Sequence, residues 1–210
     1  MSFRPASRAG NDGRSYRGRV TYRPRDNRPG FHHVVTRGNN KQRIFFNDTD
    51  RREFIRILTH VANRHGWNIY AYCLMRNHYH LVLNVDDRGL SRGMCELNSA
   101  YALNFNQSHE RINHLFGKRY WSEYLPDDRR LLNVVRYVVQ NPRRAGRTGA
   151  LESYAWSSYA ATIGLVLSFA QLATGELLTM FGGRRDRAIA RFVEFCDGDA
   201  ETGHARRQPP

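Results

Sequence analysis

Hydrophobic and polar residues follow two different periods along the middle of this chain. Short segments rich in β-branched and aromatic residues are typical of strands, whereas longer segments with apolar residues at every third or fourth position are typical of helices. The strands are expected at residues 31–37, 67–74, 78–85 and 115–124. The long helices are expected at residues 50–65, 91–107 and 127–139.

Local signals support the ends of these helices. Asp50 followed three residues later by Glu53 resembles a capping box, which predicts that the first long helix begins there. Gly66 is expected to end that helix. Asp127 and Asp128 suit the positive N-terminal end of the third helix.

The order of the elements predicts the fold class. Strands and helices in the order β-α-β-β-α-β-α indicate an α+β fold, with a mostly antiparallel sheet and helices packed on one face. Arg76 and Asn77 form a short link between the second and third strands, which predicts a hairpin. Beyond a short packed turn at residues 156–159, two amphipathic helices are expected at residues 171–180 and 187–195.

The two ends of the chain have a different composition from its centre. Residues 1–30 are rich in arginine and glycine and poor in aliphatic residues, so they cannot bury enough surface to offset their ordering entropy. A flexible tail is expected there, either scanning phosphate backbones or serving only as a solubilising extension. Residues 165–197 are interpreted as a C-terminal helical extension, and residues 198–210 as a disordered tail.

Composition narrows the class of partner. The 210 residues are enough for one well-buried domain with tails, and the formal net charge of +14 favours a polyanionic partner, most often nucleic acid. A solvated basic surface is the alternative. The three cysteines form neither a disulfide framework nor a CxxC zinc pair, which favours a reducing compartment. No segment resembles a membrane span or a secretory signal, so a cytoplasmic protein is expected.

Two histidines provide the first sign of chemistry. His78 and His80 lie two residues apart in a predicted strand, so both side chains point to the same face. Neutral imidazoles in this arrangement can hold one divalent metal ion and leave positions open for substrate oxygens. The alternative is a half-buried surface pair without a ligand.

A second group of residues lies at the end of the third predicted helix. Tyr137 and Asn141 are four residues apart, so both can face one site. Asn141 could give Mg²⁺ or Mn²⁺ a third, oxygen ligand, with Gln140 as the fallback. The alternatives are a tyrosine in the helix core, and Asn141 as the N-cap of a following turn that begins at Pro142.

Together these groups indicate cleavage of a nucleic-acid strand. A metal ion would neutralise the phosphate and help the phenol of Tyr137 to ionise for in-line attack. Attack on DNA would join the tyrosine to the 5′ phosphate and free a 3′ hydroxyl, and this stored bond allows transfer to a second strand end.

The motifs resemble those of the single-tyrosine HUH transposases of the insertion sequence 200-like type, and most closely the REP-associated tyrosine transposases. The resemblance covers residues 31–164, which would form the catalytic domain with a ferredoxin-like HUH core. The matching segments, in the family's order, are residues 31–39, 48–54, 75–82, 136–146 and 156–159.

The resemblance implies a role for each motif residue. His78 and His80 would be metal ligands, Tyr137 the nucleophile, and Asn141 would replace the glutamine of many transposon-encoded members. It also implies recognition of hairpins in single-stranded DNA, by a monomer or a homodimer associated with the nucleoid. The candidate phosphate contacts are Arg37, Arg76, Arg143 and Arg144. The alternatives are a domesticated nucleic-acid-binding protein that does not cut, and a metal-dependent RNase.

Overall fold

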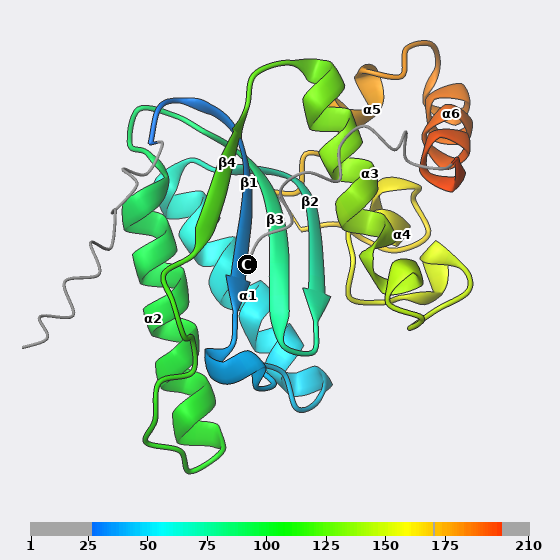
Figure 1. Cartoon of the computed structure of the whole chain (residues 1–210). Coiled ribbons are helices and arrows are strands. Elements are labelled where there is room, and N and C mark those ends of the chain that lie inside the picture. The colour runs from blue at the N-terminus through cyan, green and yellow to red at the C-terminus, as the bar shows by residue number, and fades with distance from the viewer. Residues whose placement is uncertain (1–26, 170, 199–210) are drawn as a thin grey trace, which may run out of the picture.

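The centre of the molecule is a four-stranded sheet in which every neighbouring pair of strands is antiparallel (Figure 1). The computed structural model describes residues 27–169 and 171–198, so the predictions for the two tails lie almost wholly outside the described residues. The spatial order of the strands is β2-β3-β1-β4. The strands are β1 (Gly30–Arg37), β2 (Asn68–Met75), β3 (His78–Val85) and β4 (Trp121–Leu125).

The helices complete the α+β fold that the sequence predicts. The long ones are α1 (Asp48–His65), α2 (Leu90–Ser108) and α3 (Asp128–Arg144). The shorter ones are α4 (Tyr159–Thr162), α5 (Thr174–Thr179), α6 (Arg185–Asp197) and the 3₁₀ turns η1 (Asn39–Lys41) and η2 (Leu151–Ser153). None of the helices in residues 27–169 and 171–198 is long and apolar enough to cross a bilayer.

The sheet is covered on both faces, which corrects the expectation of helices on one face only. Figure 1 shows α1 and α2 on one side of the sheet and α3 with the C-terminal helices on the other. Along β3, Tyr79 and Leu81 belong to the first core, whereas Val82 belongs to the core that α3 covers. Strands buried on both faces have nearly continuous apolar runs, so alternation alone could not reveal the second helical layer.

The C-terminal helices share the second core with α3. Val138 of α3, Leu177 of α5 and Phe192 of α6 all belong to this cluster and are buried. The predicted C-terminal helices are therefore present, and they pack against the layer that carries α3.

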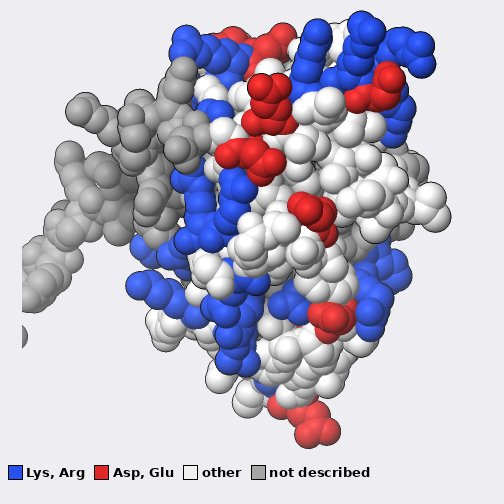
Figure 2. All heavy atoms as spheres, turned by 90° about the vertical axis from the view of Figure 1, so that its right-hand side faces the viewer, with Lys and Arg blue, Asp and Glu red and all other residues white. Residues whose placement is uncertain are grey.

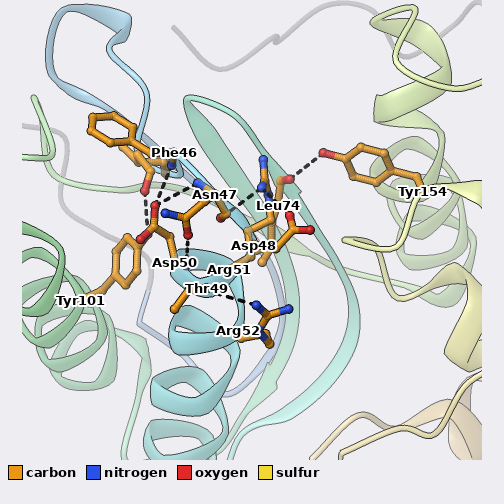
Figure 3. Close-up of polar contacts among 11 residues, drawn as sticks. Phe46, Asn47, Asp48, Thr49, Asp50, Arg51, Arg52, Leu74, Tyr101 and Tyr154 are labelled. Atoms are coloured by element: carbon orange, nitrogen blue, oxygen red, sulfur yellow. Dashed lines mark hydrogen bonds and ion pairs between the residues drawn. The ribbon is translucent and has the colours of Figure 1, made fainter. Parts of the chain in front are cut away.

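The first turn of α1 has a capping box, but one turn earlier than the sequence indicated. Asn47 is the N-cap, and its side chain accepts a hydrogen bond from the Asp50 amide while Asp50 accepts one from the Asn47 amide (Figure 3). The predicted second member, Glu53, pairs instead with Arg56 at 2.7 Å. Asp50 is buried and also lies 2.8 Å from His109. It therefore joins the start of α1 to the end of α2.

The link between β2 and β3 forms the predicted hairpin, and β3 has the predicted limits. In contrast, β4 is only five residues long, because the chain at residues 115–120 forms a loop that packs against the turn after β1. Asn39 donates a backbone hydrogen bond to Leu115 in this contact. The loop therefore adjoins the end of the sheet at which β1 ends and β3 begins.

Candidate metal and tyrosine site

His78 and His80 lie together on the face of the sheet that α3 covers. Their ring centroids are 5.0 Å apart, His80 is buried and His78 is half-buried. The register with β1 places Arg37 opposite His78 and Val35 opposite His80. The two imidazoles are therefore fixed by a central strand with partners on both sides.

Each of these imidazoles has its Nδ1 engaged. The Nδ1 of His78 lies 2.7 Å from the Oδ1 of Asn77, whose Nδ2 donates to the Lys41 carbonyl at 3.2 Å. The Nδ1 of His80 lies 3.1 Å from the Nε2 of His33. Within the described part of the chain neither Nε2 makes a hydrogen bond, so both Nε2 atoms could act as ligand nitrogens.

The environment keeps these histidines neutral. Burial, followed by the charge of Arg37, lowers the pKa of His78 to about 4. Burial, followed by the neighbouring imidazoles of His33 and His78, holds the pKa of His80 well below its usual value. Because a metal ion binds only the neutral imidazole, the site is ready for a ligand at neutral pH.

The two imidazoles are compatible with a divalent metal ion, but they do not by themselves complete its coordination sphere. Across residues 27–169 and 171–198, no group of three His, Cys, Asp or Glu side chains could hold a metal. Two imidazole nitrogens would leave positions for an amide oxygen, water or a phosphate oxygen. An open coordination sphere of this kind suits catalysis better than a structural role.

Tyr137 on α3 lies beside this pair. Its ring centroid is 5.7 Å from that of His80 and 6.0 Å from that of His33, with edge-to-face geometry in both contacts. The side chain is half-buried at the border of the second core, rather than enclosed in it. The structure thus brings together the tyrosine and one histidine of the pair from distant parts of the chain.

The two candidate amides lie in different surroundings. Gln140 is buried, and its Nε2 donates to the carbonyls of Cys196 at 2.6 Å and Gly198 at 3.2 Å. Asn141 is half-buried, and its Nδ2 donates to the Tyr137 carbonyl at 2.9 Å. The amide of Gln140 therefore binds backbone carbonyls at the end of α6, whereas the amide of Asn141 lies one helical turn from the tyrosine.

Asn141 does not cap a new helical turn. Pro142 lies inside α3, which continues to Arg144. Proline removes one backbone donor from the helix, and the residue before it usually avoids helical geometry. Here the extra hydrogen bond from the Asn141 side chain to Tyr137 reinforces the turn just before the proline.

The four candidate arginines fall into two groups. Arg37 at the end of β1 and Arg76 in the β2–β3 turn lie at the end of the sheet that carries His78. Arg144 is exposed, and its guanidinium carbon lies 5.5 Å from the centroid of the Tyr137 ring. Arg143 forms an ion pair with Asp197 at 3.0 Å. Arg143 is thus already paired with an acidic residue at the C-terminal end of α6.

Basic side chains also cover other parts of the surface. Figure 2, viewed from the side of the C-terminal helices, shows lysine and arginine side chains across the top and along the left, with carboxylates more scattered. Lysine and arginine side chains thus form broad basic regions on this face. Such surfaces attract polyanions at long range.

One residue that the sequence analysis did not select, His33, joins this group. It is buried, its Nε2 contacts His80, and its ring packs edge-on against Trp121 with the centroids 5.4 Å apart. The sequence offered one sign of this position. His33 lies four residues before Arg37 in the same strand, so both side chains point to the same face of the sheet. Its pairing with His80 depends on the β1–β3 register, which the sequence did not specify.

Comparison with known proteins identifies a matching family and a similar fold. A family model described as "Transposase IS200 like" matches residues 31–141. No curated protein matches the sequence. A solved REP-associated tyrosine transposase bound to a REP hairpin has a TM-score of 0.59 and 15% identity, with 72% of this chain and 90% of that chain covered.

Two further solved structures match with lower scores. One is a candidate transposase from Deinococcus radiodurans R1, with a TM-score of 0.39 and 14% identity over 57% of this chain and 92% of that chain. The other is the tRNA(His) guanylyltransferase of Saccharomyces cerevisiae, with a TM-score of 0.42 and 10% identity over 82% of this chain and 80% of that chain.

Proposed function

The chain belongs to the IS200-like transposase family, and on this basis we propose that it cuts and rejoins single-stranded DNA beside hairpins through a covalent tyrosine intermediate. The family identifies a transposase, an enzyme that nicks and joins DNA. The placement of Tyr137 beside His80, with ring centroids 5.7 Å apart, is the observation that most supports the covalent mechanism.

In this proposal the metal ligands are His78 and His80 through Nε2, and Asn141 through its side-chain oxygen. Their chemistry suits Mg²⁺ or Mn²⁺, and the ion would supply charge neutralisation at the scissile phosphate when bound. The engagement of each Nδ1 supports this assignment, because it leaves each Nε2 as the ligand atom. Gln140 is not proposed as a ligand, since its amide already bonds the end of α6.

The proposed covalent step uses the tyrosine that lies beside His80. The Oη of Tyr137 attacks the phosphorus, and the bond from phosphorus to the 3′ oxygen breaks. The DNA keeps a 5′ phosphate joined to the tyrosine, and the phenol proton passes through solvent to the released 3′ oxygen. The same exchange in reverse joins the 5′ phosphate to another 3′ hydroxyl, so the enzyme can transfer a strand without an external energy source.

Phosphate contacts in this proposal come first from Arg37, Arg76 and Arg144. Arg37 and Arg76 lie at the end of the sheet that carries His78, and Arg144 lies beside the Tyr137 ring. Arg143 is a weaker candidate, because its ion pair with Asp197 would have to open. The similar fold of the REP-associated transposase, which was solved with a REP hairpin, supports hairpin DNA as the substrate class.

The decisive experiment measures covalent adducts with single-stranded DNA hairpins in Mn²⁺. The wild-type protein should give a slower-migrating species that survives denaturation, and Tyr137→Phe should give none while still binding the hairpin. Tyr124→Phe on β4 is the matched control, since Tyr124 packs against His32 rather than His80, and it should form adducts normally.

Three outcomes would overturn the proposal. Adducts that persist in Tyr137→Phe would show that another residue is the nucleophile. Hairpin binding that survives a chelator, with no adduct in any metal, would instead identify a protein that binds nucleic acid without cutting it. RNA hairpins competing better than DNA hairpins would favour a ribonuclease.

A further inference from the structure

We infer that His33 is a positioning residue that fixes the ring of His80 so that its Nε2 can ligate the metal ion. The inference rests on the proposed metal role of His80 and concerns a residue outside the histidine pair itself. It follows from a contact between two buried rings on neighbouring central strands.

The contact is close and oriented. The Nε2 of His33 lies 3.1 Å from the Nδ1 of His80, and the two rings are nearly parallel, with 15° between their planes. His33 is 3% exposed and His80 is 2% exposed. With so little access to water, the two imidazoles must satisfy this contact with each other.

Metal ligation would determine which ring donates. A neutral His80 that offers the lone pair of Nε2 to a metal ion carries its proton on Nδ1. That proton is donated to the Nε2 of His33, which must then be the acceptor and carry its own proton on Nδ1. Ligating histidines usually donate the second ring N–H to a partner of this kind, and the partner sets the ring orientation.

His78 has an equivalent partner of a different type. Its Nδ1 donates to the Oδ1 of Asn77, because Asn77 uses its Nδ2 to donate to the Lys41 carbonyl. Both histidines of the pair therefore have an acceptor at Nδ1, from the hairpin turn in one case and from β1 in the other. The parallel indicates that His33 completes the support of the pair.

The surroundings hold His33 in place. Trp121 on β4 packs edge-on against its ring, and the Tyr137 ring contacts it from α3. The acceptor is thus fixed by neighbours on two elements, and it touches both the proposed ligand and the proposed nucleophile.

The test measures Mn²⁺ affinity in the absence of DNA, from the electron paramagnetic resonance signal of the free ion. His33→Phe and His33→Leu remove the acceptor, whereas His33→Gln places an amide oxygen near the position of the original Nε2. The first two should weaken Mn²⁺ binding by about 10–100-fold, a typical effect of losing such a partner. His33→Gln should recover most of the wild-type affinity.

The matched control is His32→Leu. His32 is the neighbouring buried histidine, but it lies on the opposite face of β1, and its Nε2 contacts the Arg28 carbonyl. This variant should bind Mn²⁺ as the wild type does. Thermal melting identifies which variants are folded, and either His33→Phe or His33→Leu is sufficient for the comparison.

Electron spin echo measurements of bound Mn²⁺ separate positioning from direct ligation. The same number of nitrogen ligands is expected in the wild type and His33→Gln, and loss of one nitrogen would make His33 a ligand and overturn the inference. Wild-type affinity in folded His33→Phe or His33→Leu, or no Mn²⁺ binding by the wild-type protein, would also overturn it. A wild-type protein that binds Mn²⁺ but forms no DNA adduct would refute the proposed function alone.

Discussion

Gln140 and Asn141 are adjacent in α3, but their side-chain amides bond to different parts of the molecule. Gln140 bonds the carbonyls of Cys196 and Gly198 at the end of α6, and its Oε1 accepts from Arg144 at 3.1 Å. Asn141 bonds only the Tyr137 carbonyl of its own helix, within the described residues. One amide therefore stabilises the fold, and the other is available to the site.

Substituting Gln140 and Asn141 one at a time should separate the effect on stability from the effect on metal binding. Asn141→Ala should weaken Mn²⁺ binding and leave the melting temperature nearly unchanged, because its one hydrogen bond supplements a helical turn. Gln140→Met should cost about 1–3 kcal/mol in the free energy of unfolding, because buried carbonyls lose their donor, while Mn²⁺ affinity is retained. Urea unfolding and metal titration of both variants check this, and the reverse pattern would make Gln140 the ligand.

The buried histidines predict a loss of stability in acid. In the unfolded chain a histidine takes up a proton near pH 6.5. In the folded protein burial, followed by the charge of Arg130, lowers the pKa of His33 to about 3. The unfolded state therefore binds more protons between these values, and the free energy of unfolding falls as the pH falls. His33 alone should contribute a loss of about 2 kcal/mol between pH 7 and pH 5.

This pH dependence is measured by urea unfolding at pH 7 and pH 5. His33→Gln removes the titrating group and should lose less stability over this interval than the wild type does. An equal loss in both proteins would show that His33 does not contribute.

Arg37 should contribute to the salt dependence of DNA binding. If it contacts one phosphate of the single strand, Arg37→Ala should reduce the slope of log Kd against log salt concentration by about 0.7. Arg56→Ala is the matched control, because Arg56 lies on α1 in an exposed ion pair with Glu53. A slope unchanged in Arg37→Ala, or reduced equally in the control, would remove Arg37 from the interface.

The packing of α2 predicts a strong effect at one glycine. A Cβ added at Gly93 would lie 2.2 Å from Cζ2 of the Trp67 ring, which is buried in the first core. Gly93→Ala should therefore lower the free energy of unfolding by about 1–3 kcal/mol through overpacking. Gly149→Ala is the control, because nothing lies within 4 Å of its added Cβ, and its melting temperature should stay close to that of the wild type.

The sequence predicted most elements because their signals are local. The β3 limits, the hairpin turn and the three long helices all depend on periodicity and on turn residues close in the chain. The capping box lies one turn earlier than predicted. Asn47, Asp50 and Glu53 offer two overlapping versions of the pattern, and in the structure Asn47 pairs with the buried Asp50.

The site was less accessible to sequence reasoning. The histidine pair and the tyrosine are recognisable from their own spacing, but His33 joins them only through the pairing of β1 with β3. The engagement of Gln140 likewise depends on where α6 ends, more than fifty residues later. Such contacts between distant segments leave no periodic signal in the chain.

The hydrogen bonds of Gln140 to α6 have a practical consequence for protein engineering. The segment shared with the transposase family ends at residue 141, yet α3 is held at that point by carbonyls of Cys196 and Gly198. A protein shortened to the shared segment would leave this helix without its support and uncover the apolar side chains that Phe192 and Leu177 now shield. We therefore expect that a shortened protein has to include Gly198 to keep these hydrogen bonds and the present position of the tyrosine.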